Sequence, residues 1–277
     1  MLSRHATSLL RTTLPFMRIN ARLSLSTMPK ELEKAPGLLL WRGFVEDPEE
    51  FFSRTWSIAD AVSDLAAKNA DAKVSPDHNL PNRKEEYVPL KLPDVDNPSR
   101  LLGCEHFPAY GDGHELTYFR GTRNLPSLVQ PLVEKLDALP AVRDEVLWNR
   151  GRLGRKASTP HEWRLTMNRY VARDAALTRP GFPWHRDIEA NGASTMILGL
   201  GSSGRLQFAE DPLGGDLRIA KTLDGLRYDS DYTPSLDLTL EPGDLLVLTG
   251  KSRWQMIHRV AGEGNGGARA SLVFGCS

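Results

Sequence analysis

The chain has 277 residues, of which 40% are hydrophobic and 25% charged, as in a globular protein that buries a sizeable core. No stretch reaches the ~18 uncharged apolar residues that a membrane span requires. The formal net charge is zero, and the two cysteines, Cys104 and Cys276, lie far apart and lack the clustering of a zinc site. We therefore expect two thiols rather than a disulfide.

Residues 1–27 differ from the rest of the chain in charge, because they contain four arginines and no acidic residue. Together with their many Ser, Thr and Leu residues, this composition is typical of a mitochondrial transit peptide. We expect mitochondrial import; the alternative is a disordered basic tail, and Met28 offers a second start for a cytosolic or nuclear form. Without residues 1–27 the chain has 31 basic and 35 acidic residues, a charge of −4 that disfavours strong binding to nucleic acid.

Residues 28–159 are predicted to form an α/β extension. Within them, the apolar run 37–41 predicts a short strand. Asp47 and Pro48 indicate the start of a helix, because Asp caps the first N–H groups and Pro fits the first turn. This helix is expected to end near Lys68.

Two further segments of the extension have a recognisable composition. Residues 71–100 are rich in Pro, Asp and Asn and are predicted to be a loop. Ser127 is the expected N-cap of a second helix, whose apolar stripe at helical spacing ends at Pro140.

Residues 160–277 change to short apolar runs separated by Gly and Pro turns. Strands are expected at about 163–171, 194–200, 205–208, 236–240, 245–248, 254–260 and 270–274. Many short strands with tight turns indicate a sandwich or a jelly roll. Residues 211–235 are too long for a hairpin turn and are predicted to be a surface insertion.

The strongest chemical signal is His185 and Asp187, which one residue separates. In an extended segment, residues i and i+2 face the same side, so an imidazole and a carboxylate can meet one metal ion. A third ligand is available from His258 on a later predicted strand. Two histidines and one carboxylate form the facial triad of Fe(II) oxygenases, with three positions left for a 2-oxo acid and O₂. A His-x-Asp pair alone is common, and its alternative is a surface pair in a loop.

Arg269 begins the last predicted strand, among apolar residues. A guanidinium in such a place must find an anion or reach solvent. A carboxylate is a good partner because it pairs with guanidinium through two parallel hydrogen bonds. The alternative is an arginine at the rim in an ordinary ion pair.

Taken in order, these motifs resemble the AlkB family of Fe(II)/2-oxoglutarate-dependent dioxygenases. The resemblance covers roughly residues 163–274 and includes Asn-x-Tyr, His-x-Asp, the Glu-Pro-Gly-Asp turn, a later His and a strand that begins with Arg. It assigns the metal, Fe(II), to His185, Asp187 and His258. It assigns 2-oxoglutarate to Asn168, Tyr170, Arg269 and Ser271. The implied fold is mainly β, a double-stranded β-helix (jelly roll) in 160–277 with the α/β extension packed on it, and no catalytic residue is expected beyond the metal centre.

The chain departs from the family pattern in its last motif, which often continues as Arg-x-Asn-x-x-x-Arg. Here Ser271 replaces the Asn, and Gly275 replaces the second Arg. Both positions share the parity of Arg269, so the pocket loses one positive charge. Weaker binding of 2-oxoglutarate is the expected consequence.

The resemblance implies oxidative demethylation of a methylated nucleobase in RNA or DNA, with O₂ as co-substrate. We expect the protein to be a monomer. Glu189 and Trp163 are the candidate substrate contacts, Tyr110, Tyr118 and Phe119 are further candidates for stacking, and the basic run from Arg150 to Lys156 is a candidate phosphate contact. Their alternatives are a solvated loop residue, core aromatics and a solvated charged face. The acidic chain favours a second reading, a hydroxylase or demethylase of a protein side chain. A third is a catalytically silent interaction module, which a lost metal ligand would mark.

Overall fold

The computed structural model describes residues 29–74, 86–110, 114–145, 161–170, 181–188, 191–214, 226–227, 232–262 and 267–277. The expectations for residues 1–27, Met28, Glu189 and the run from Arg150 to Lys156 lie outside these residues. Within them, no helix is both long and apolar enough to cross a membrane. Cys104 and Cys276 are both buried, and no disulfide joins them.

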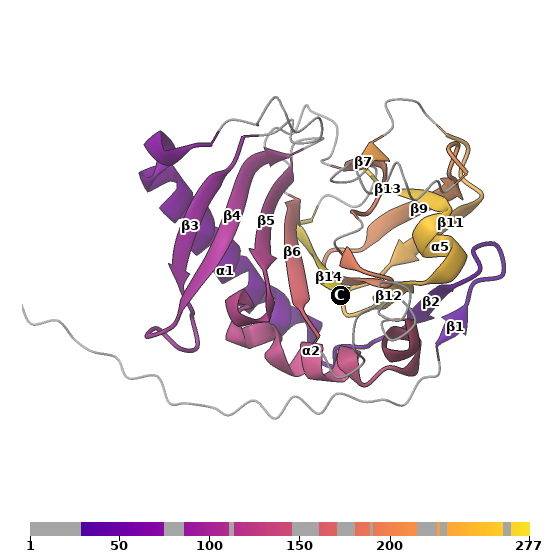
Figure 1. Cartoon of the computed structure of the whole chain (residues 1–277), viewed down its shortest axis with the longest axis horizontal. Coiled ribbons are helices and arrows are strands. Elements are labelled where there is room, and N and C mark those ends of the chain that lie inside the picture. Colours follow the sequence, from indigo (N-terminus) through magenta and orange to yellow (C-terminus); the bar gives the residue numbers. More distant parts are fainter. Residues whose placement is uncertain are drawn as a thin grey trace, which may run out of the picture.

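The described residues form two antiparallel sheets with helices on one side of the larger one (Figure 1). The larger sheet has the strand order β1 (Lys30–Glu31), β2 (Leu38–Trp41), β12 (Leu245–Leu248), β8 (Thr195–Gly201), β14 (Arg269–Cys276), β6 (Trp163–Tyr170), β5 (His114–Arg120), β4 (Leu101–Tyr110), β3 (Val88–Pro93). The smaller sheet has the order β10 (Leu226–Arg227), β7 (Phe182–Arg186), β13 (Met256–Ala261), β9 (Gly204–Glu210), β11 (Leu236–Leu240). The helices are α1 (Pro48–Lys68), α2 (Gln130–Asp137) and α5 (Gly250–Trp254), with short 3-10 turns at Ala70–Ala72, Thr122–Asn124 and Ser127–Val129.

The strands from β6 to β14 wind into a double-stranded β-helix. Each strand of the first half pairs antiparallel with its counterpart in the second half: β6 with β14, β7 with β13, β8 with β12, and β9 with β11. Because successive pairs alternate between the two sheets, the segment is a long hairpin rolled on itself, which is a jelly roll. The expected mainly-β fold is confirmed, and β5, β4 and β3 continue the large sheet beyond β6 (Figure 1).

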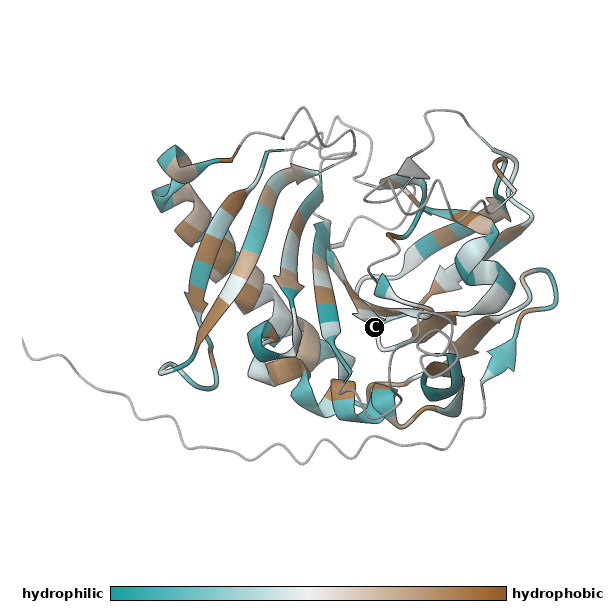
Figure 2. Cartoon of the chain, in the orientation of Figure 1, coloured by the Kyte–Doolittle hydropathy of each residue, from teal (hydrophilic) through white to brown (hydrophobic). Residues whose placement is uncertain are grey.

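The two faces of the large sheet bury different apolar clusters, visible as brown bands along the strands (Figure 2). On the helix side, alternate residues of β6 and β14 pack with α1 and α2; they include Trp163, Leu165, Met167, Leu272 and Phe274. Inside the roll, a second cluster includes Ile197, Leu206, Phe208, Leu246 and Met256. The residues of opposite parity on β6 and β14 therefore face the interior of the roll, where the candidate site lies.

Helix α1 begins and ends as expected. The Asp47 carboxylate accepts a hydrogen bond from the Glu50 N–H at 3.0 Å, and Pro48 occupies the first turn. The helix buries Ile58, Ala59, Val62 and Ala66 at helical spacing against the large sheet.

The prediction of a loop over 71–100 was wrong, because strand β3 lies within it. Val88, Leu90 and Leu92 are buried and alternate with exposed residues, as in a half-buried strand. The two prolines of β3 concealed this alternation. They are tolerated because β3 pairs only with β4 and is an edge strand.

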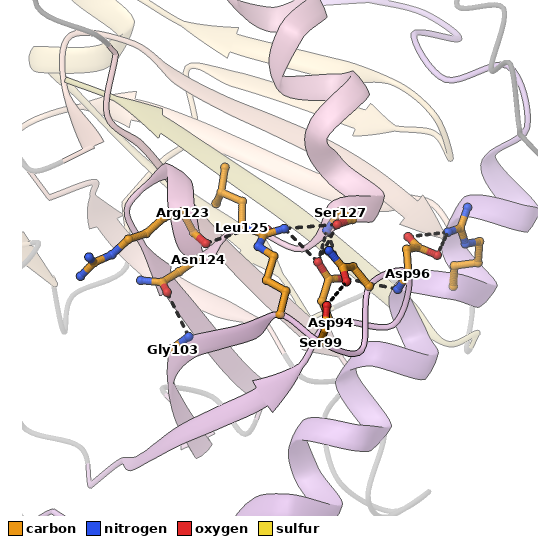
Figure 3. A network of polar contacts seen from close by, with 11 residues as sticks. Asp94, Asp96, Ser99, Gly103, Arg123, Asn124, Leu125 and Ser127 are labelled. Atoms are coloured by element: carbon orange, nitrogen blue, oxygen red, sulfur yellow. Dashed lines mark hydrogen bonds and ion pairs between the residues drawn. The ribbon is translucent and has the colours of Figure 1, made fainter.

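The prediction of Ser127 as the N-cap of α2 was wrong. Ser127 is the first residue of a 3-10 turn that precedes the helix. Its hydroxyl donates to the buried Asp94 carboxylate at 2.6 Å, and its N–H donates to the same group (Figure 3). Arg100 donates to Asp94 as well, at 2.9 Å. A carboxylate from a distant segment thus fixes this end of the helix, which the local sequence cannot show.

Candidate metal centre

His185 and His258 lie opposite each other on the paired strands β7 and β13. Their ring centroids are 4.2 Å apart. Asp187 follows β7 and lies on the same side, with one carboxylate oxygen 3.8 Å from His185 Nε2 and the other 3.8 Å from His258 Nε2. One ligand atom from each of the three residues lies within 4.8 Å of the other two, so the structure brings the predicted triad together around one point.

The protonation of these groups suits a cation. His185 Nδ1 lies 2.8 Å from the Pro183 carbonyl, so this nitrogen carries the proton and Nε2 is left to bind a metal. Burial lowers the pKa of His258 and outweighs the opposite effect of Asp187, which favours the neutral imidazole that metals bind.

Asp187 remains a carboxylate despite its burial. Burial alone raises the pKa of this group, but the interactions of the carboxylate with the imidazoles of His258 and His185, with the Arg253 guanidinium and with the Thr195 hydroxyl outweigh that effect and hold the pKa below its ordinary value. Its Oδ2 atom is buried and has no hydrogen-bond partner among the described residues. A carboxylate oxygen without a hydrogen-bond partner that faces two imidazoles is an arrangement that could hold a metal ion.

Two buried arginines hold the backbone around Asp187. The Arg253 guanidinium, on α5, donates to the carbonyl oxygens of Asp187 at 3.2 Å, Ile188 at 2.7 Å and Gly192 at 3.1 Å. In return, Arg186 of β7 donates to the Trp254 carbonyl at 3.0 Å and pairs with the buried Asp211 at 2.7 Å. We call this pair the arginine clasp: it ties the segment after Asp187 to α5 from both sides. The sequence interpretation had overlooked both residues.

Arg269 lies inside the roll, 5% exposed, and its guanidinium is 4.7 Å from the Tyr170 ring. None of its three guanidinium nitrogens has a hydrogen-bond partner among the described residues. A Cβ at Gly204 would lie 2.2 Å from Arg269 Nε, so glycine leaves the room that the guanidinium needs. Because burial of an unpaired charge is costly, the site is complete only with an anion.

Asn168 and Ser271 continue the polar group beside Arg269. They are register partners on β6 and β14, and Asn168 Nδ2 donates to Ser271 Oγ at 3.2 Å. The Asn168 Oδ1 atom is buried without a partner in the described structure, so this amide also has capacity for a ligand. The four predicted 2-oxoglutarate residues therefore lie on two neighbouring strands, with their side chains in the roll.

A series of rings connects this anion site to the metal ligands. Tyr170 stacks on His114 at 5.0 Å, His114 contacts Phe182 at 4.9 Å, and Phe182 contacts His185 at 4.1 Å between ring centroids. Tyr110 lies 5.6 Å from both His114 and Phe182. Of the aromatic residues expected to stack on a substrate, Tyr110 thus lies beside the site. His114 and Phe182 carried no sequence signal.

Trp163 lies elsewhere, and the expected substrate contact is not available from it. Its side chain is 3% exposed and belongs to the apolar cluster between the large sheet and the helices. It shares the parity of Leu165 and Met167, so it faces away from the interior of the roll, whereas Tyr170 faces into it.

Comparison with known proteins adds little to this geometry. No family model matches the sequence, and no curated protein sequence matches it. A solved structure titled "The structure of OsALKBH1" is similar, with 14% identity and a TM-score of 0.44 over 89% of this chain and 100% of that chain. At this level of similarity, activity has to be inferred from the residues of the chain itself.

Proposed function

We propose that the chain is an Fe(II)- and 2-oxoglutarate-dependent dioxygenase. The observation that carries this proposal is the combination, in one roll, of a triad of two histidines and a carboxylate with a buried arginine whose guanidinium has no hydrogen-bond partner among the described residues. The triad fits Fe(II) because two imidazole nitrogens and one carboxylate oxygen are the ligand set of non-haem Fe(II) oxygenases, and these three residues would hold the ion. When bound, the iron and 2-oxoglutarate supply O₂ activation, with a substrate C–H bond hydroxylated as 2-oxoglutarate becomes succinate and CO₂.

The chain itself contributes binding, orientation and exclusion of water. His185, Asp187 and His258 hold the metal in the protonation states derived above, while the arginine clasp fixes the backbone of Asp187. Arg269 pairs with the distal carboxylate of the co-substrate, and Asn168 donates or accepts beside it. The rings of Tyr170, His114 and Phe182 line the interior between Arg269 and the metal ligands, and they exclude water from that side.

The test measures succinate formed from 2-oxoglutarate under O₂, together with bound Fe(II), in the wild type and in His258→Ala. The variant should lose both the metal and the turnover, since the remaining two ligands hold Fe(II) weakly. Succinate formation that persists unchanged in His258→Ala argues against this centre, and a wild type that binds neither Fe(II) nor 2-oxoglutarate favours the catalytically silent module.

For the substrate we propose a methylated nucleobase in RNA or DNA, demethylated by hydroxylation of its N-methyl group. Tyr110 and Phe182 support this, because they place stackable rings next to the metal ligand His185. The basic residues of 150–156 and Glu189 are further candidates from the sequence. The opposing observation is the net charge of −4 without residues 1–27, which favours a protein substrate.

Salt dependence distinguishes the two substrates. Binding of methylated oligonucleotides through phosphates should weaken linearly in log–log terms as salt rises, and reversal of charge at Arg150, Arg152, Arg155 and Lys156 should flatten that slope. Absence of oligonucleotide binding at low salt, or binding that survives the charge reversal, supports the protein substrate instead. We also propose that residues 1–27 direct the protein to mitochondria.

A further inference from the structure

A second group of metal-ligating side chains lies where β6 begins and β14 ends. It consists of Asp137, His161 and Cys276, and one ligand atom of each residue lies within 4.8 Å of the other two. Asp137 is the last residue of α2, His161 lies two residues before the start of β6, and Cys276 is the last residue of β14. The three come from separate elements, so only the folded chain assembles the group.

The pairing of β6 with β14 explains why His161 and Cys276 meet. Cys276 is the register partner of Trp163, and the pairing continues through two backbone hydrogen bonds between Glu162 and Ser277, at 3.1 and 3.2 Å. Opposite residues and those two positions away share a face of the sheet, and diagonal neighbours remain within reach of long side chains. His161 and Cys276 therefore point to the helix side, where α2 ends and where His161 Nδ1 contacts the Asp137 carboxylate.

The backbone on both sides of the group is held in place. The Thr122 hydroxyl accepts from the Trp163 N–H at 3.0 Å and donates to the His161 carbonyl at 3.2 Å. Gly192 packs directly on Cys276, since a Cβ at Gly192 would lie 1.7 Å from the Cys276 carbonyl oxygen. Ligands on anchored strands are preorganised, which lowers the entropic cost of binding an ion.

We propose that Asp137, His161 and Cys276 bind a zinc ion. Thiolate, imidazole and carboxylate are the ligands that Zn²⁺ takes, at about 2.3, 2.0 and 2.0–2.2 Å. Their exposure is graded: Cys276 is 1% exposed, while the side chains of His161 and Asp137 are 18% and 45% exposed. The ion would thus lie at the protein surface, with water in the fourth position, and the Cys276 thiol would give up its proton on binding.

Such an ion would fix both ends of the segment 138–160, because Asp137 and His161 directly flank it. This segment carries Arg150, Arg152, Arg155 and Lys156. The two cysteines alone gave no indication of zinc, since the other two ligands are distant in sequence and only the fold brings them to Cys276.

The test uses the full chain, stripped of metal with a chelator and titrated with Co(II). A thiolate bound to Co(II) produces an intense charge-transfer absorption in the near ultraviolet. His185, Asp187 and His258 contain no sulfur, so the band reports the second site alone. We expect the band to appear in the wild type, to persist in His185→Ala and to saturate there with one Co(II) per chain, and to disappear when Zn(II) is added in excess.

Cysteine variants identify the ligand. Cys276→Ser should lose the band, whereas the matched control Cys104→Ser should keep it, because Cys104 lies on β4 and does not belong to the group. Substitution of a buried residue can perturb folding, so the more exposed Asp137→Asn and His161→Gln provide a second measure. Both should weaken Co(II) binding at least tenfold while the circular dichroism spectrum stays that of the wild type. Absence of the band in the wild type, its survival in Cys276→Ser, or unchanged Co(II) affinity in both Asp137→Asn and His161→Gln would overturn the proposal.

Discussion

Substitution of Arg269 by Met should separate binding of the co-substrate from binding of the metal. Met is similar in length and apolar, so it fills the space between Tyr170 and Gly204 without the charge. Truncation of one partner of a buried charge pair costs about 2–5 kcal/mol, and about 1.4 kcal/mol corresponds to a factor of ten. The KM for 2-oxoglutarate should therefore rise roughly 30-fold to a few thousand-fold, with Fe(II) affinity unchanged.

The same variant should change the stability of the protein in a direction that depends on the ligand. Without ligand, the wild type buries a guanidinium that has no hydrogen-bond partner within the described part of the chain, so Arg269→Met should unfold at the same or a higher temperature. With 2-oxoglutarate and a redox-inert metal, the wild type should be stabilised and the variant should not. Arg205→Met is the matched control, because it removes an exposed ion pair with Asp237 on the smaller sheet. An unchanged dependence of turnover on 2-oxoglutarate in Arg269→Met refutes the assignment of Arg269.

Three further predictions concern the clasp, the pH dependence and the leader. Arg253→Lys should weaken Fe(II) binding about 10- to 100-fold in a competitive metal titration. The reason is that a lysine cannot donate to all three carbonyls that Arg253 binds. Lys251→Gln, on the same helix, is the control and should bind Fe(II) like the wild type. The pKa values of His258 and Asp187 are lowered in the fold, so the unfolded chain takes up these protons first. The metal-free protein should therefore lose stability as the pH falls below 6.5, the ordinary pKa of His258, and again below 3.8, the ordinary pKa of Asp187. Urea unfolding of the wild type and of His258→Gln at pH ~7 and ~5.5 measures the first of these losses. Equal losses in both proteins would contradict the prediction. Residues 1–27 fused to a fluorescent reporter should direct it to mitochondria, and replacement of their four arginines by Glu should abolish this; a cytosolic wild-type fusion excludes the leader.

Local patterns predicted those features that depend on neighbours in sequence. The cap of α1 at Asp47, the alternation along β11 and the common parity of His185 and Asp187 all follow from repeat distances of the backbone, and the structure has each of them. The error at Trp163 was avoidable on the same grounds. Trp163 shares the parity of Leu165 and Met167, whereas Asn168 and Tyr170 have the other parity, so the sequence already placed it on the opposite face from the site.

Features that depend on distant segments could not be read in this way. His114 reaches the site because β5 pairs with β6, and Arg253 because α5 packs beside the segment that follows Asp187. Neither residue stands in a pattern that distinguishes it from other polar residues in sequence. The group of Asp137, His161 and Cys276 likewise depends on the pairing of β6 with β14 and on the position where α2 ends.

Gly275 connects the departure in the last motif to the packing of the metal centre. A Cβ at this position would lie 2.6 Å from the Asn191 Cα, so the backbone that returns from Asp187 fills the space where a second arginine would begin. Asn191 is held there by its hydrogen bond to the Ile188 carbonyl at 3.1 Å, and Arg253 binds the same carbonyl. The close approach of the Asn191 backbone is therefore incompatible with a larger residue at Gly275. It leaves Arg269 as the one guanidinium that the described part of β14 directs into the roll, so under the proposed function we expect recognition of a distal carboxylate to rest on this single charge, assisted by Asn168 and Ser271.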